Sequence, residues 1–427
     1  MKVKPGYKRT EVGVIPAEWD VKPLGAILSK GRLGGNYPNQ DQATEHPLIK
    51  MGNIARGYVN ISKTEYITPG ITPEGQHKLT KGDVLFNTRN TLDLVGKVAI
   101  WRDELPVAYY NSNLMRLEFD AKQVCSNEYA NLALNTASAI GVLRGLATGT
   151  TSVAAIYTRD LMKLPFVVPP LREQRAIASA LSDVDALAGA LERLIVKKRD
   201  LKRAAMQQLL TGETRLPGFH SDWSFLDISR NASLKARIGW QALTSDEYRE
   251  SGTHYLVTGT DFIGGRVNWG TCHFVDQWRY DQDRNIQLKN GDVLVTKDGT
   301  IGKVGFVEGL TGPATLNSGV FVIRPLRDSF VPAFLFCLLR SRVFDDFIAK
   351  ITAGSTITHL YQKDFIGFKF LAPGLAEQTA IAAVLTDMDA ELAAMEQRLA
   401  KTLALKQGMM QELLTGRTRL VFAEVAA

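Results

Sequence analysis

The sequence predicts an α+β protein: two globular domains joined by two long helices that pair as an antiparallel coiled coil. Three observations predict this fold: an internal repeat, apolar heptads within the repeated segments, and short β-rich runs in the segments that precede them. The expected boundaries are residues 1–158 for the first domain, 159–216 for the first repeated helical segment, 217–362 for the second domain, 363–420 for the second helical segment and 421–427 for a tail.

The internal repeat is clearest in residues 159–216, which align without a gap on residues 363–420 at an offset of 204, with 27 of 58 positions identical. Weaker matches lie upstream, at offsets of 206 to 209: Gly82-Asp83 with Gly291-Asp292, Gly96-Lys97 with Gly302-Lys303, and Asn111-Ser112 with Asn317-Ser318. The order of elements is therefore kept while loop lengths differ, as expected for a duplicated chain.

Apolar residues recur at alternating four- and three-residue intervals through both repeated segments, which is the spacing of a coiled-coil seam. The expected seam residues are Ile177, Leu181, Val184, Leu191 and Ile195 in the first copy, and Ile381, Leu385, Met388, Leu392, Met395 and Leu399 in the second. A helix of about 40 residues is roughly 60 Å long. We expect the helices to end near Gly212 and Gly416, because glycine readily adopts the left-handed conformation found at helix C-termini.

The charges of the two helices favour an antiparallel pairing. Residues 171–211 carry 8 basic and 5 acidic groups, whereas residues 375–415 carry 3 basic and 6 acidic groups. The basic cluster lies late in the first helix and the acidic cluster lies early to midway in the second: Arg193, Lys197, Lys198, Arg199, Lys202 and Arg203 against Asp387, Asp389, Glu391 and Glu396. Antiparallel packing brings the two clusters together, although the basic cluster could equally face DNA phosphates.

The segments before the helices are typical of mixed α+β domains. Short runs rich in β-formers, such as residues 84–86 and 293–295, are bounded by Gly, Asn, Asp and Pro. Longer stretches near residues 127–146 and 331–350 are expected to be helical. Each domain also opens similarly, with a glycine shortly before Trp19 and before Trp223.

The overall composition permits a polyanionic partner without requiring one. The chain has 427 residues and a formal net charge of +7, which is mild for this length. Cys125, Cys272 and Cys337 are widely spaced, which argues against a disulfide framework or a thiolate metal site. We see neither a secretory signal nor an apolar run long enough to span a membrane, so we expect a cytoplasmic protein.

Motifs that carry catalysis are missing from the sequence. Neither Gly96-Lys97 nor Gly302-Lys303 has the upstream glycine and following hydroxyl residue of a phosphate-binding loop. The six histidines are scattered, without metal-ligand spacing, so no metal site is expected. The Asp/Asn-Pro-Pro-aromatic tetrapeptide of amino-methyltransferases is also absent. We therefore predict a binding protein rather than an enzyme, with no catalytic residues and no cofactor of its own.

Corresponding polar loops in the two halves contain the side chains that read DNA. Arg and Lys recognise guanine, Asn and Gln recognise adenine, and hydroxyl groups position phosphates. The candidate DNA-binding residues are Thr88, Arg89, Asn90, Lys97, Asn111, Asn113, Thr150 and Thr151 in the first half, and Lys297, Asp298, Thr300, Lys303, Asn317, Ser318, Ser355 and Thr356 in the second. Each residue alone is more often a turn former, so the interpretation rests on their coincidence in matching regions.

Two motifs carry a resemblance to a known family. A Pro-x-Leu-x-Glu-Gln-x-x-Ile helix start occurs at residues 169–177 and again at 373–381, and a Leu-Leu-Thr-Gly helix end occurs at 209–212 and again at 413–416. This order, covering essentially the whole chain, resembles the specificity subunit of Type I restriction-modification systems. The second copy has Gly374 in place of Pro170 and Ala376 in place of Arg172, so we expect a looser start to its helix.

The resemblance implies a division of labour between this chain and its partners. Each variable domain would be a target-recognition domain that reads one half of a split, asymmetric double-stranded DNA sequence. The coiled coil would act as a ruler and as a dock for two adenine-N6 methyltransferase subunits, which restriction subunits that translocate DNA then join. S-adenosylmethionine, ATP and Mg would be held by those partner subunits.

Two other function classes stay open at this point. A protein-interaction scaffold would use the same loops to contact proteins and the coiled coil to dimerise. A single-chain fusion of methyltransferase and nuclease is disfavoured by the missing motifs. Salt-dependent DNA binding separates the first class from a DNA reader, because phosphate contacts release counterions.

Overall fold

A computed structural model of the chain describes residues 3–150, 152–239, 242–352 and 359–420. The expected tail, residues 421–427, lies outside this range. The chain forms two compact units: the first comprises the residues up to Glu192 and those from Arg398 onward, and the second comprises Arg193–Gln397. Each unit therefore contains one globular domain and one half of each long helix.

The globular part of the first unit is built around two mixed sheets, of order β4-β13-β9-β11-β7 and β12-β6-β8-β5. Their strands are β4 (Leu28–Leu33), β5 (Asn39–Gln40), β6 (Pro47–Ile49), β7 (Gly57–Tyr58), β8 (Glu65–Ile67), β9 (Val84–Asn87), β11 (Val98–Ile100), β12 (Tyr109–Tyr110) and β13 (Leu114–Phe119). Alternate residues of a strand face opposite sides. Val84 and Phe86 accordingly enter the core that contains Trp19, while Leu85 enters a second core with Trp101.

Smaller elements complete the first unit. The strands are β1 (Tyr7–Thr10), β2 (Gly13–Pro16), β3 (Asp20–Pro23), β10 (Arg89–Asn90), β14 (Thr148–Gly149), β15 (Ala154–Ala155) and β16 (Pro165–Val168), and the short helices are α1 (Asn127–Leu134), α2 (Ala137–Leu146) and α3 (Thr158–Leu161). The single helical stretch expected near residues 127–146 divides into α1 and α2. The division follows from Thr136, whose hydroxyl caps α2 by accepting from the backbone N–H of Ala139.

The second unit repeats this plan with a six-stranded sheet of order β18-β26-β23-β24-β21-β20 and a three-stranded sheet of order β22-β19-β25. The strands are β17 (Ser224–Asp227), β18 (Ala232–Ala236), β19 (His254–Val257), β20 (Phe262–Ile263), β21 (Arg266–Val267), β22 (His273–Val275), β23 (Val293–Thr296), β24 (Val304–Phe306), β25 (Ala314–Leu316), β26 (Val320–Pro325) and β27 (Lys369–Ala372). The short helices are α5 (Ile228–Asn231), α6 (Gln277–Asp281), α7 (Pro332–Leu339), α8 (Arg342–Thr352) and α9 (Gln362–Phe365).

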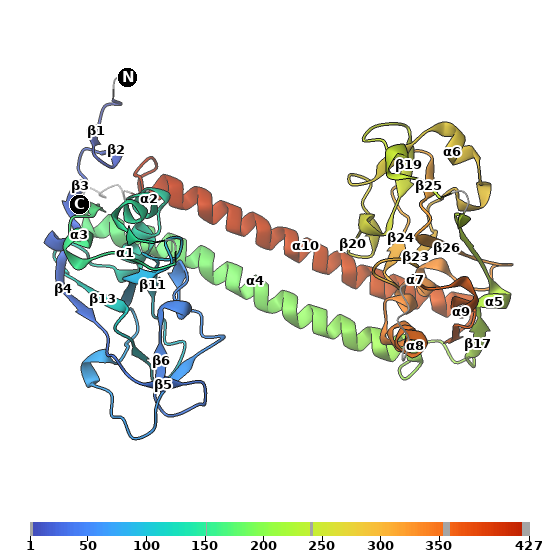
Figure 1. Cartoon of the computed structure of the whole chain (residues 1–427), viewed down its shortest axis with the longest axis horizontal. Helices are drawn as coiled ribbons and strands as arrows, with labels where there is room; N and C mark the ends of the chain where they lie inside the picture. Colours follow the sequence, from blue (N-terminus) through green and yellow to red (C-terminus); the bar gives the residue numbers. More distant parts are fainter. Residues whose placement is uncertain (1–2, 151, 240–241, 353–358, 421–427) are drawn as a thin grey trace. The chain divides into compact units, whose positions relative to one another are not determined.

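The two long helices are α4 (Leu171–Thr211) and α10 (Leu375–Leu413), which run side by side in opposite directions within each unit (Figure 1). In the second unit Lys198 pairs with Glu391 at 2.7 Å and Arg199 with Glu396 at 2.6 Å. In the first unit Lys406 pairs with Asp185 at 2.5 Å. These ion pairs confirm the expected antiparallel coiled coil.

Both helices end where expected, since Gly212 and Gly416 have φ angles of +77° and +68°. The eleven expected seam residues are buried or half-buried, and Leu181 and Leu385 are fully buried. The repeated segments also contain α3 and β16, or α9 and β27, ahead of the helices. Those short elements pack with the globular domains, through the pairs β16–β3 and β27–β17. No helix among the described residues is long and apolar enough to cross a membrane.

Candidate nucleic-acid interface

In the first unit, three of the polar loop segments singled out from the sequence meet, namely residues 88–90, 111–113 and 148–150. We call this meeting point the junction. The backbone N–H and the hydroxyl of Thr88 both donate to the carbonyl oxygen of Asn113, at 3.0 and 2.8 Å. Strand β10 then pairs with β15, so that Arg89 lies opposite Ala155. Strand β14 lies on the other side of β15. The junction leaves the side chain of Arg89 exposed at the surface.

The equivalent junction in the second unit uses different side chains. The backbone N–H of Lys297 donates to Gly319 at 2.9 Å, and its carbonyl oxygen accepts from Leu360 at 2.7 Å. Asp298 then forms an antiparallel bridge with His359, and their side chains are hydrogen-bonded through Oδ1 and Nδ1. The offsets of the repeat make Asp298 the counterpart of Arg89. An exposed arginine in one half is thus replaced by an aspartate–histidine pair in the other.

Several other candidate residues have polar contacts inside their own domains. Lys303 donates its Nζ to the carbonyl oxygen of Gly259 at 2.9 Å. Asn317 donates to the hydroxyl of Tyr248 at 2.7 Å. Asn111 is buried, and its Oδ1 accepts from the backbone of Asn113 at 3.3 Å. The structure therefore gives these amides and this ammonium group local partners within the fold.

The remaining candidates are distributed as follows. Thr150 and Thr300 are exposed, whereas Asn90, Lys97 and Ser318 are half-buried. The hydroxyl of Thr150 is 3.2 Å from that of Ser152, and the carbonyl oxygen of Thr300 accepts from the hydroxyl of Thr296. Thr151, Ser355 and Thr356 lie outside the described residues.

Matching acid–arginine pairs fix the strands on which these loops are carried. Asp292 is buried and accepts from Arg324 through both carboxylate oxygens, at 2.7 and 2.6 Å. In the first unit Asp83 accepts from Arg116 at 3.2 Å. Each aspartate also accepts a backbone N–H three residues before it. Sequence reasoning noted the repeated Gly-Asp but not its arginine partner on the neighbouring strand.

The Glu-Gln motif at each helix start binds the segment that follows the end of the other long helix, in an arrangement that we call a clasp. In the first clasp, Arg419 donates to both carboxylate oxygens of Glu173, at 2.7 and 2.9 Å, and stacks over the ring of Trp19. The indole Nε1 of Trp19 also donates to Glu173, at 2.8 Å. The hydrogen bonds to Glu173 raise the pKa of Arg419 above its ordinary range.

The second clasp repeats the ion pair with one difference. Arg215 donates to both oxygens of Glu377, at 2.7 and 2.6 Å, and stacks over the ring of Trp223. The Nε1 of Trp223 is buried but has no hydrogen-bond partner among the described residues. Both arginines belong to a Thr-Arg-Leu that follows each Leu-Leu-Thr-Gly, a repeated signal that could have identified them from the sequence.

The glutamine of each motif connects the helix start to its domain through hydrogen bonds. Gln174 accepts from the backbone of Cys125 at 3.0 Å and donates to Pro169 at 2.9 Å. Gln378 accepts from Val331 at 2.8 Å and donates to Pro373 at 2.8 Å. Both helices begin at the equivalent leucine, and the N–H of Gln174 donates to Pro170 as that of Gln378 donates to Gly374, both at 3.0 Å, so the looser second start that we expected is not found.

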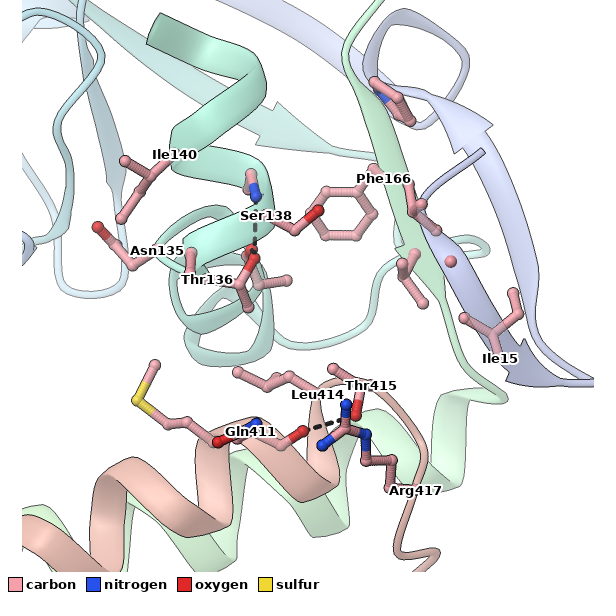
Figure 2. Close-up of a pocket in the computed structure, with 18 of the residues that line it drawn as sticks. Ile15, Asn135, Thr136, Ser138, Ile140, Phe166, Gln411, Leu414, Thr415 and Arg417 are labelled. Atoms are coloured by element: carbon pink, nitrogen blue, oxygen red, sulfur yellow. Dashed lines mark hydrogen bonds between the residues drawn. The ribbon is translucent and has the colours of Figure 1, made fainter. Parts of the chain in front are cut away.

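A pocket of about 1050 Å³ lies in the first unit between the β1–β2 hairpin, the start of α2 and the end of α10 (Figure 2). Figure 2 shows Thr136, which caps α2, and Ser138 of α2 above Gln411 of α10 and Leu414, which follows α10. The described residues that line it include no carboxylate, histidine or cysteine. No group of three or more potential metal ligands occurs in the described part of the chain either. The features that recur in both units are instead the junctions and the clasps.

Comparison with known proteins decides the family. The model of the Type I restriction modification DNA specificity domain matches residues 16–198 and again residues 242–404. The chain belongs to this family. Two matches in one chain confirm the internal repeat, and the family assigns the chain to DNA target recognition rather than to catalysis.

Relatives within the family match over nearly the whole chain. The MjaVIII specificity subunit of Methanocaldococcus jannaschii is 23% identical, over 95% of this chain and 94% of its own length. The EcoBI specificity subunit of Escherichia coli is 20% identical, over 86% and 78%. The crystal structure of the S subunit from M. genitalium covers 97% of this chain and 98% of its own, with a TM-score of 0.60 and 16% identity. The last likeness supports the specificity-subunit fold described above.

Proposed function

We propose that this chain reads a split, asymmetric DNA target, with one half-site bound by each globular domain. The observation that carries the proposal is the pair of equivalent junctions, which have the same backbone bonds but different side chains, Arg89 in one and Asp298 with His359 in the other. Two domains that share a backbone arrangement but present different side chains are expected to recognise different DNA sequences. The target would therefore not be a palindrome.

The chemistry of the junction side chains suits base recognition in the major groove. Arginine binds the O6 and N7 atoms of guanine, and a carboxylate accepts from the amino group of cytosine. Arg89 and Asp298 are the residues that we propose as base readers, one in each half. Exposed hydroxyl residues such as Thr150 and Thr300 would position the phosphates.

The long helices would act as the spacer between the two half-sites. The separation of half-sites on DNA follows the separation of the elements that read them. The clasps, the ion pairs between α4 and α10 and the buried seam all resist sliding of one helix along the other. We therefore infer that helix length sets the unread gap in the target.

Catalysis would reside in partner subunits in the cytoplasm. Two adenine-N6 methyltransferase subunits would dock on the coiled coil, and restriction subunits that translocate DNA would join them. S-adenosylmethionine, ATP and Mg would bind those partners. The proposal is supported by the relatives named above, which are specificity subunits of type I restriction enzymes.

Removal of one heptad from each long helix tests the spacer role. Residues 190–196 and 395–401 lie between the Lys202–Asp389 and Lys406–Asp185 pairs, so their deletion keeps both pairs and both clasps. Seven residues shorten a helix by about 10 Å, or about three base pairs at 3.4 Å each. With the methyltransferase subunits present, we expect the selected DNA motif to keep both half-sites with a gap shortened by about three base pairs, or binding to be lost.

Recognition of the original gap by the shortened chain would refute the spacer role. The undeleted chain, assayed in the same way, provides the control for DNA reading itself. If that chain with its methyltransferase subunits shows no sequence preference and no salt-dependent binding, the DNA-reading proposal fails as a whole.

A further inference from the structure

An exposed tyrosine stands beside the junction in both units, at positions 204 residues apart. Tyr157 and Tyr361 are 60% and 51% exposed. Neither hydroxyl makes a hydrogen bond with any residue that the structure describes. Both domains therefore keep a large aromatic side chain in solvent at the same place, although the domains have diverged elsewhere.

The backbone holds both tyrosines firmly in place. The carbonyl oxygen of Tyr157 accepts from Asp160 and from the buried Leu161, both at 3.0 Å. The carbonyl oxygen of Tyr361 accepts from Asp364 and from the buried Phe365, both at 3.1 Å. These bonds anchor each tyrosine to the core of its domain and fix where the side chain leaves the surface.

Each tyrosine directly follows the residue that closes the junction. The backbone N–H of Ile156 donates to Thr88 at 2.9 Å, and that of Leu360 donates to Lys297 at 2.7 Å. The tyrosine is therefore next in the chain to a residue bonded to the loop that carries Arg89, or to the loop that carries Asp298.

Exposed basic residues follow both tyrosines closely in the chain. The side chain of Arg159 is 84% exposed, and that of Lys163 is 68% exposed, with both sharing Asp160. In the second unit the Nζ of Lys363 lies 5.5 Å from the centroid of the Tyr361 ring. Tyrosine hydroxyls and basic side chains are among the groups by which proteins hold the DNA backbone.

We propose that Tyr157 and Tyr361 are equivalent contacts to the sugar-phosphate backbone, one for each half-site. This inference rests on the DNA-reading function proposed above. Side chains that differ between the halves, Arg89 and Asp298, are suited to bases that differ. A side chain that is the same in both halves is suited to what every DNA sequence shares, which is its backbone. The two tyrosines thus position the readers without contributing to sequence choice.

Replacement of each hydroxyl tests this assignment in the full chain with its methyltransferase subunits. We expect Tyr157→Phe and Tyr361→Phe each to weaken binding to a 40-base-pair random-sequence duplex by roughly three- to tenfold. Because tyrosine is neutral and releases no counterion, the slope of log affinity against log salt should not change. The motif recovered by sequencing DNA retained from a random library should also be unchanged.

Tyr58→Phe is the matched control, because Tyr58 is 52% exposed and lies on β7, which pairs with β11 and not with the junction strands β10, β14 or β15. It should leave DNA affinity unchanged. Wild-type affinity in Tyr157→Phe and Tyr361→Phe, or an altered motif, would overturn the assignment while the DNA-reading function stands. If the unmodified chain itself fails to bind DNA, the DNA-reading function falls and this inference falls with it.

Discussion

The two clasps differ in how many of their polar groups are hydrogen-bonded, although both use a glutamate and an arginine from the same repeated motifs. In the first clasp Trp19 is fully buried and donates to Glu173, Arg419 reaches Glu18 at 3.0 Å, and the hydroxyl of Tyr7 donates to Gly416 at 3.0 Å. In the second clasp the indole N–H of Trp223 has no acceptor among the residues that the structure describes, and Arg215 adds one carbonyl contact, to Ser221 at 2.9 Å.

The difference shows that duplication preserved the ion pair while its surroundings diverged. Glu18 and Tyr7 belong to the opening segment of the first unit, which includes the β1–β2 hairpin. An identical motif can therefore give clasps of unequal strength, and we expect the first unit to depend on its clasp more than the second.

Removal of each glutamate should have the largest effect. Loss of one partner from a buried ion pair costs about 3–5 kcal/mol. Glu173→Ala also leaves the buried indole N–H of Trp19 without an acceptor, which adds about 1–3 kcal/mol. We therefore expect Glu173→Ala to lower the free energy of unfolding of the first unit more than Glu377→Ala lowers that of the second. Hydrogen exchange measured on peptides from each unit would report both values, and equal losses would contradict the comparison.

Replacement of the tryptophans should have an intermediate effect, and it removes the indole N–H together with part of the ring. Trp19→Phe removes a hydrogen bond to a charged group, worth about 1.5–3 kcal/mol. Trp223→Phe removes an N–H that has no acceptor within the described part of the chain, so we expect the free energy of unfolding to fall by less than about 1 kcal/mol. Each variant serves as the control for the other in urea unfolding. A larger loss in Trp223→Phe would show that the second indole has a partner in solution.

Acidification should have the smallest effect on the free energy of unfolding, and this effect should fall on the first unit. His77 is buried, and burial lowers its pKa below the ordinary value of 6.5. The unfolded chain therefore takes up a proton before the folded chain does. The contribution of His77 to the free energy of unfolding is therefore complete above pH 6.5, and it is lost as the pH falls through the lower pKa of the folded state.

The second unit provides the internal comparison for this pH effect, because none of its described histidines is buried. Hydrogen exchange between pH 7 and pH 5 should show the first unit losing protection, and His77→Gln should flatten that change. If hydrogen exchange in the first unit depends on pH in the same way with and without His77, protonation of His77 is not the cause.

Regular features were predictable from the sequence because they depend on local periodicity. The seam from Ile177 to Leu399 follows from heptad spacing, and the helix ends follow from the glycines at 212 and 416. The pairing of Lys198 with Glu391 followed from charge once the direction was assumed. The fold class and the family were correct for the same reason, since both rest on repeated short-range patterns.

The direction of individual loop side chains was not predictable, because it depends on residues far away in the chain. Lys303 and Asn317 looked like free donors, but their acceptors, Gly259 and Tyr248, are 44 and 69 positions away. Arg419 is 246 positions from Glu173. Such partners become visible only when the tertiary structure brings the segments together.

Exchange of residues 218–362 for the corresponding domain of another family member would test whether each domain reads its own half-site. The hybrid chain would be expressed with its methyltransferase subunits, and methylated adenines would be mapped by sequencing the cell's DNA. We predict that one half-site changes while the other half-site and the gap between them stay the same. A change in both half-sites, or in neither, would contradict the assignment of one half-site to each domain.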